Sequence, residues 1–115
     1  MSTSYLTLKI GDSIVWNIQY KQANNIAVNL TGFMIDINAQ SKFNNKELFK
    51  ITTTTTPNDN MYINMTNIVN GEFQVIIKDT SFFTKGDYFV DIEYTDQQGI
   101  KKSSKSVTLK VLDRL

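Results

Sequence analysis

The chain of 115 residues contains no cysteine and no histidine. Without cysteine, neither disulfide bonds nor thiolate chemistry can contribute to this protein. The common catalytic triads need a histidine or a cysteine, so they cannot be assembled here. Zinc sites and most transition-metal sites lose their usual ligands for the same reason. We therefore expect no cofactor, no catalytic residues, no site for these metals and no enzymatic activity.

Other features that would indicate a partner are also scarce. The five glycines are scattered, so no glycine-rich phosphate loop is present. No apolar run approaches the length of a membrane span, and residues 1–4 lack the basic and apolar parts of a signal peptide. The net charge is only +1, which gives no sign of a nucleic-acid partner. Lys101, Lys102 and Lys105 lie near one another without interleaved aromatic residues, which is typical of a solvated turn.

The residues that are present predict a single all-β domain over residues 1–115. A chain of this length forms one domain, and its 41% of hydrophobic residues can supply a core. Apolar and polar residues alternate in short runs, which is the pattern of a sandwich or barrel. The predicted strands cover residues 5–10, 13–20, 33–39, 47–51, 61–65, 72–78, 87–95 and 104–112.

The same alternation predicts which side chains face the core. The inward residues are Leu6, Leu8 and Ile10; Ile14, Trp16, Ile18 and Tyr20; Phe33, Ile35, Ile37 and Ala39; Phe49 and Ile51; Phe73, Val75 and Ile77; Tyr88, Val90, Ile92 and Tyr94; and Val107, Leu109 and Val111. We interpret Trp16 as a core anchor, and a ligand-stacking position at the surface is the alternative.

Several connections carry recognisable turn residues. Asn70-Gly71 predicts a hairpin turn with positive φ angles, and residues 57–60 predict another turn. The threonine run 52–56 fits either an edge strand or an extended loop.

Residues 79–84 predict one helical turn near the end of the sandwich. Asp79 or Thr80 would be its N-cap. We expect Phe82 or Phe83 to close that end of the core.

Carboxylates are the remaining groups that could support catalysis or bind a metal. Asp87, Asp91 and Glu93 lie on one face of a predicted strand. A glycosidase needs two carboxylates that face each other across a cleft, whereas three in a row are typical of the polar side of a half-buried strand. A calcium site that uses Asp87, Asp91 or Asp96 with loop carbonyls is the alternative, although the spacing does not match a calcium-binding loop.

Because no catalytic groups are found, we expect the protein to act through surfaces that contact other molecules. Val15, Met34, Ile76 and Phe89 face outward in the predicted strands. Gathered into one patch they would mark a contact surface, whereas scattered exposure or burial beneath loops would be ordinary.

Four segments, taken in order, resemble a known group of proteins. DSIVW at residues 12–16 precedes VNLTGF at residues 28–33, GEFQV follows at residues 71–75, and KGDYFVDIE spans residues 85–93. This succession is similar to the small Ig-like β-sandwich proteins of tailed bacteriophages, including the N-terminal domain of phage baseplate upper proteins. In that group D-L-T-G precedes one strand and G-x-Y-x-x-D-I-E lies in another; here Asn29 takes the place of the aspartate.

The resemblance covers nearly the whole chain and implies an antiparallel Ig-like β-sandwich of seven or eight strands. It also implies a non-enzymatic virion structural protein of the baseplate, fibre, neck or capsid surface, made in the host bacterial cytoplasm. Its partners would be other virion structural proteins, and symmetric self-assembly would be natural. The alternative is a carbohydrate- or receptor-binding module, in which loops rich in Asn and Thr bind a surface glycan together with Tyr5, Tyr20, Tyr62 and Tyr94.

Overall fold

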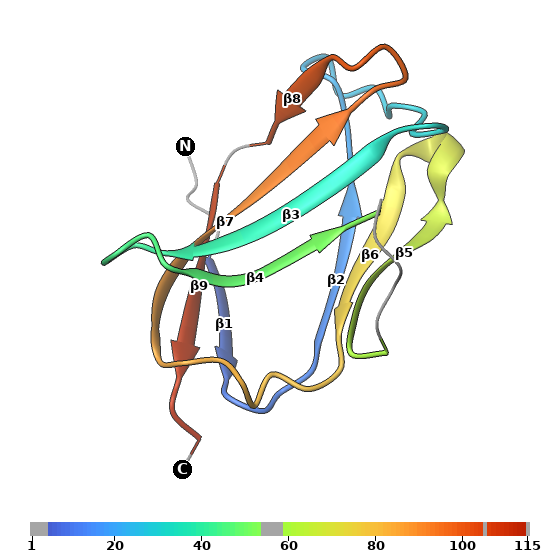
Figure 1. Ribbon diagram of the computed structural model, residues 1–115. Helices are drawn as coiled ribbons and strands as arrows, with labels where there is room; N and C mark the ends of the chain where they lie inside the picture. Colours follow the sequence, from blue (N-terminus) through green and yellow to red (C-terminus); the bar gives the residue numbers. More distant parts are fainter. Residues whose placement is uncertain (1–4, 54–58, 105, 115) are drawn as a thin grey trace.

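The computed structural model describes residues 5–53, 59–104 and 106–114, whose nine strands form two sheets packed face to face (Figure 1). The strands are β1 (Tyr5–Lys9), β2 (Ile14–Gln19), β3 (Met34–Ser41), β4 (Glu47–Thr52), β5 (Met61–Asn67), β6 (Glu72–Ile77), β7 (Gly86–Thr95), β8 (Lys101–Ser103) and β9 (Val107–Leu112). One sheet has the order β1-β9-β7-β3-β4, with β8 also paired to β7, and the other has the order β2-β6-β5. The predicted all-β sandwich is confirmed.

The strand β7 organises the larger sheet. β3 pairs along one edge of β7 over eight residues, and the other edge is shared by β9 and β8. The sequence pattern does not predict β8 as a separate strand. All three of its residues are exposed, so no alternation of apolar and polar side chains marks it.

The pairing of β1 corrects the prediction of a wholly antiparallel sandwich, because β1 runs parallel to β9. Leu6 lies opposite Leu109, and Leu8 lies opposite Val111. After β1 the chain enters β2, which belongs to the other sheet. β1 therefore forms no hairpin with its sequence neighbour. Its direction depends on the path of the whole chain, which alternation does not encode.

The core lies between the sheets and contains the side chains that alternation predicts to face inward, except Val107, which is partly buried outside the core cluster. The most deeply buried are Ile35, Ile37, Ala39, Phe73, Val75, Ile77, Leu109 and Val111. Burying one large apolar side chain of this kind stabilises the fold by about 1.5–3 kcal/mol. Trp16 is only partly buried: its ring packs against Phe49, with centroids 6.4 Å apart, and its other side reaches the surface. Trp16 thus packs against the core without being a fully buried anchor, and part of its side chain remains exposed, as the surface alternative requires.

The connection between β5 and β6 differs from the predicted two-residue turn. A 3-10 helix, η1 (Ile68–Asn70), precedes Gly71, and of the Asn-Gly pair only Gly71 has a positive φ, at 73°. A Cβ atom on Gly71 would lie 2.7 Å from the carbonyl oxygen of Tyr20 and 2.8 Å from that of Val28. Glycine is therefore required both by the backbone angle and by the close approach.

No helix in the described part of the chain is long and apolar enough to cross a membrane.

The loop between β6 and β7 contains one hydrogen-bonded turn where a helical turn was predicted. The Phe83 amide donates to the Thr80 carbonyl at 2.9 Å. The buried Thr80 hydroxyl does not cap this turn, because it accepts from the Gly11 amide at 2.9 Å and donates to the Asp12 carbonyl at 2.6 Å. These bonds join the loop to the β1–β2 connection. Of the two residues predicted to close this end of the core, Phe82 and Phe83, it is Phe83 that is buried there.

The threonine run begins inside a strand. Thr52 is the last residue of β4, and the hydroxyl of Thr53 accepts from the Ile35 amide at 3.0 Å. The rest of the run and the first half of the predicted turn, residues 54–58, lie outside the described residues.

Candidate functional site

The outward-facing apolar residues singled out in the sequence do not form one patch. Val15 and Ile76 lie opposite each other on the outer side of the β2–β6 pair. Met34 and Phe89 belong to the other sheet, toward opposite ends of the β3–β7 pair. The predicted contact surface is therefore not built from these four side chains.

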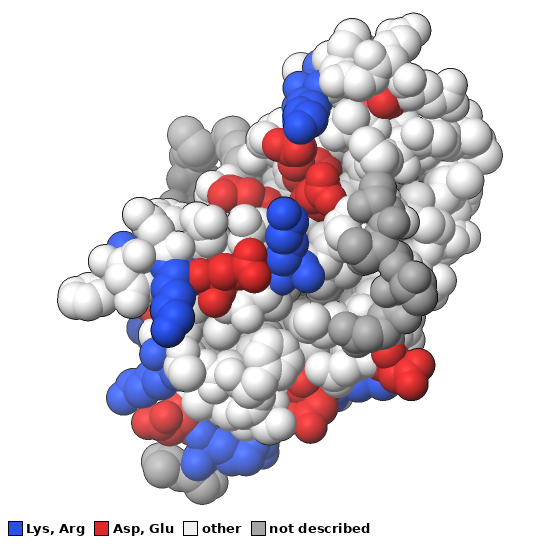
Figure 2. Space-filling model, in the orientation of Figure 1, with Lys and Arg blue, Asp and Glu red and all other residues white. Residues whose placement is uncertain are grey.

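The carboxylates of β7 line two open surface pockets: Asp87 lines one at the β3–β4 hairpin, and Asp91 and Glu93 line another of about 510 Å³ together with Asp36 and Lys50. Asp87, Asp91 and Glu93 lie on the outer face of the larger sheet, where Figure 2 shows acidic and basic side chains side by side. Glu93 forms an ion pair with Lys101 at 3.8 Å, and Asp91 accepts a hydrogen bond from the Ser106 hydroxyl. This is the predicted polar side of a half-buried strand. Lys101 and Lys102 are exposed as predicted, but they belong to β8 and not to a turn.

The arrangement of the acids also does not support the calcium alternative. Asp87 and Asp96 are nine residues apart along an extended segment, a separation of roughly 30 Å. The Asp96 carboxylate instead accepts from the amides of Gln98 and Ile100, at 2.8 and 3.0 Å, within the turn after β7. Over the described ranges no three acidic residues converge closely enough to hold a metal ion.

The tyrosines do not form a platform for a carbohydrate. Tyr20 and Tyr94 stack on each other with ring centroids 3.8 Å apart, and Tyr94 is buried. Burial, and secondly the neighbouring Tyr20, raise the pKa of the Tyr94 hydroxyl well above its ordinary value. Tyr62 lies in β5 of the smaller sheet, with the Lys78 ammonium 5.8 Å from its ring centroid. The side chain of Tyr5 lies outside the described part of the structure.

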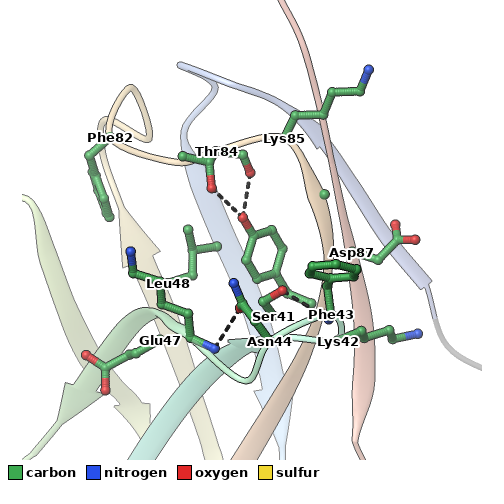
Figure 3. A pocket seen from close by; sticks show the side chains of 13 residues that line it. Ser41, Lys42, Phe43, Asn44, Glu47, Leu48, Phe82, Thr84, Lys85 and Asp87 are labelled. Carbon is green, nitrogen blue, oxygen red and sulfur yellow. Dashed lines mark hydrogen bonds between the residues drawn. The ribbon is translucent and has the colours of Figure 1, made fainter.

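Exposed aromatic surface gathers instead at one end of the sandwich. Phe43, at the tip of the β3–β4 hairpin, is 95% exposed, and Phe82, in the β6–β7 loop, is 47% exposed. Both line an open pocket of about 690 Å³, the Phe43–Phe82 pocket, with Leu48 and Tyr88 among its other walls (Figure 3). Alternation does not single out Phe43, because the other residues of 41–46 are all polar and such a segment is typical of a turn. A single phenylalanine within such a turn was the available signal.

Hydrogen bonds hold the hairpin tip that carries Phe43. The Ser41 amide donates to the Lys46 carbonyl, and the Asn45 amide donates to the Ser41 carbonyl, both at 2.9 Å. The Ser41 hydroxyl accepts from the Phe43 amide at 3.1 Å. Asn45 has a φ of 57°, which asparagine tolerates better than most residues. The turn therefore presents Phe43 to solvent, away from the core.

Phe82 is supported by aromatic contacts that continue into the core. The Phe83 ring stacks on Phe49 with centroids 5.7 Å apart, and Phe82 meets the Phe83 ring edge-on at 4.9 Å. Successive side chains of an extended loop point in different directions. Because Phe83 enters the core, Phe82 is left at the surface beside the pocket.

The pocket has a hydrogen-bonded wall and a rim of mixed charge. The buried Tyr88 hydroxyl donates to the Thr84 carbonyl at 2.7 Å and contacts the Thr84 hydroxyl at the same distance (Figure 3). The charged side chains that line the pocket are Lys42, Lys46, Lys85, Glu47 and Asp87, a surplus of one positive charge. The Lys42 ammonium lies 4.7 Å from the centroid of the Phe89 ring. An aromatic centre with a charged rim is the usual composition of a protein-binding surface.

No protein-family model and no curated protein sequence matches this chain. Among solved structures, the IG1 homodimer of RIG-5 matches with a TM-score of 0.52 and 12% identity, over 99% of this chain and 93% of that chain. Murine CRIg matches with a TM-score of 0.46 and 12% identity, over 97% and 93% of the two chains. Dpr1 IG1 bound to DIP-eta IG1 matches with a TM-score of 0.46 and 16% identity, over 96% and 91%. The likeness to RIG-5 confirms the predicted fold class: this chain is an Ig-like β-sandwich.

Proposed function

We propose that this chain is a non-enzymatic Ig-like module that acts by binding other proteins. The observation that carries the proposal is the Phe43–Phe82 pocket, where two exposed rings flank an open pocket with a charged rim. Aromatic side chains are enriched at protein interfaces and supply much of the binding free energy there. A partner that covers Phe43 would bury nearly the whole ring, which the folded domain leaves in water.

We further propose that the partners are structural proteins of a tailed-bacteriophage virion and that copies of the chain assemble symmetrically. The support is the resemblance of residues 85–93 to the small Ig-like phage proteins. Four residues of that segment, Lys85 to Tyr88, line the Phe43–Phe82 pocket. The segment that carries the resemblance thus contributes to the proposed contact surface. The protein would be made in the host bacterial cytoplasm and act within the virion.

Two matched variants test the contact surface. Phe43→Ser removes the most exposed ring, and Val69→Ser removes a side chain of η1 that is 65% exposed and lies in neither proposed contact site. Neither change disturbs the core, so both variants should fold. Light scattering over a concentration series measures self-assembly, and co-sedimentation with purified particles of the phage that encodes the chain measures binding. We expect Phe43→Ser to weaken association about tenfold or more and Val69→Ser to leave it unchanged.

The two parts of the proposal can fail separately. If both variants associate as strongly as the unchanged protein, the contact does not involve the Phe43–Phe82 pocket. Mass spectrometry of purified particles tests the location. A chain that is absent from the particles, but still binds another protein through Phe43, would overturn the virion role and leave the binding function standing.

A further inference from the structure

The strand β2 has a partner on one side only among the described residues: it pairs with β6 and forms the edge of the smaller sheet (Figure 1). The Tyr20 amide donates to the Gly71 carbonyl at 2.9 Å, and the Tyr20 carbonyl accepts from the Val28 amide at 3.0 Å. The main-chain groups of Tyr20 therefore point toward the β6 side. Because these groups alternate along a strand, the amides and carbonyls of Val15, Asn17 and Gln19 point to the open edge.

An apolar groove of about 1020 Å³ runs beside this open edge, between the two sheets. Trp16 and Ile18 line it from β2, and Val90 and Ile92 line it from β7. On the side of the larger sheet the groove lies where the neighbour of β7 changes from β9 to β8. Leu6 of β1, Ser103 of β8 and Val107 of β9 line it there. The four side chains from β2 and β7 belong to the same core that is closed elsewhere.

We propose that this groove binds an extended segment of a partner protein, which adds to β2 as a fourth strand of the smaller sheet. The open amides and carbonyls of β2 would form a main-chain ladder with the segment, and alternate apolar side chains of the segment would enter the groove between the sheets. This site is separate from the Phe43–Phe82 pocket, because the two share no lining residue.

The dimensions and charge of the groove indicate the length and composition of the segment that would bind there. Six residues of β2 span roughly 20 Å, so a segment of about six residues would match the edge and direct about three side chains inward. Lys21 is the one charged residue among the described residues that line the groove. The best fit is therefore an extended segment with apolar residues at alternate positions and a carboxylate at the end that meets Lys21. A segment with a lysine or arginine at that end would be disfavoured.

Trp16 provides a direct readout, because it is the only tryptophan of the chain and lines the groove. The probes are two synthetic eight-residue peptides in which valine and threonine alternate. One peptide has an aspartate at its N-terminal end, and the other has an aspartate at its C-terminal end. The control peptide has the same composition with its valines consecutive. We expect a saturable blue shift of Trp16 emission with one alternating peptide and at least a tenfold weaker response with the control.

A pair of variants tests the main-chain ladder. Asn17→Pro removes the Asn17 amide hydrogen, which faces the open edge, and proline is tolerated on edge strands. Asn17→Ala keeps that hydrogen. Both variants lose the same side-chain bond, which Asn17 accepts from Gln74 at 2.8 Å. We expect Asn17→Pro to weaken peptide binding about tenfold relative to Asn17→Ala. If Asn17→Pro does not fold, an alternating peptide N-methylated on the residues that face β2 tests the same hydrogen bonds with the protein unchanged.

The results separate the alternatives. Equal binding by Asn17→Pro and Asn17→Ala, or by the N-methylated and unmodified peptides, would overturn the strand-pairing model. No change in Trp16 emission at millimolar peptide would overturn the proposal as a whole. If the protein is a dimer that Asn17→Pro dissociates, the edge is occupied by a second copy and the proposed partner segment is wrong. Phe43→Ser should leave peptide binding unchanged, so failure here is distinct from failure at the Phe43–Phe82 pocket.

Discussion

Gly71→Ala should destabilise the fold much more than Gly99→Ala. Both glycines have positive φ angles, 73° and 83°, so alanine costs roughly 1–2 kcal/mol at either position through the backbone alone. At Gly99 a Cβ atom would meet no atom within 4 Å. At Gly71 it would lie 2.7 Å from the Tyr20 carbonyl oxygen and 2.8 Å from that of Val28. Real Cβ atoms do not approach a backbone oxygen so closely, so one of these segments must move.

The required movement also disturbs hydrogen bonds. Gly71 accepts from the Tyr20 amide at 2.9 Å, and Tyr20 accepts from the Val28 amide at 3.0 Å. Each bond contributes roughly 0.5–1.5 kcal/mol to stability. We therefore expect Gly71→Ala to lower the free energy of unfolding by about 3 kcal/mol and Gly99→Ala to lower it by about 1 kcal/mol.

Urea unfolding followed by Trp16 fluorescence measures the difference. With an m-value of roughly 1–3 kcal/mol/M, a difference of about 2 kcal/mol separates the two midpoints by about 1 M. Coincident midpoints would refute the packing argument at Gly71 and leave the backbone angle as the whole effect.

Three further substitutions test other parts of the core. Thr80→Val should cost about 1–3 kcal/mol in urea unfolding, because it leaves the Gly11 amide and Asp12 carbonyl without their partner, whereas Thr80→Ser should cost little. Trp16→Ala should cost about 2 kcal/mol by circular dichroism, less than the roughly 3–5 kcal/mol of a fully buried tryptophan, since one side of the ring is already at the surface. Stability should fall as pH rises above about 10, where an unfolded tyrosine loses its proton but folded Tyr94 keeps it; Tyr94→Phe should flatten this decline between pH 9 and 11.

The inward faces of the strands were predictable from the sequence because a strand in a sandwich has one side on the core. In β3, β6 and β7 the apolar residues recur at every second position, and the structure buries or partly buries these side chains. β8 was not predicted as a separate strand because its three residues are all exposed. Residues 41–46 are polar apart from Phe43, so no alternation indicates on which side Phe43 lies, and its exposure became known only from the structure.

Alternation reports whether a side chain faces the core, because burial repeats with the period of the strand. It carries no information about which strand lies alongside, since pairing joins residues far apart in the chain. The parallel course of β1, the contact of Thr80 with Gly11, and the meeting of Phe43 with Phe82 around one pocket all arise from such long-range pairing. The open edge of β2 has the same origin: its apolar residues indicate a strand facing the core, but only the arrangement of both sheets leaves part of that core open beside Trp16.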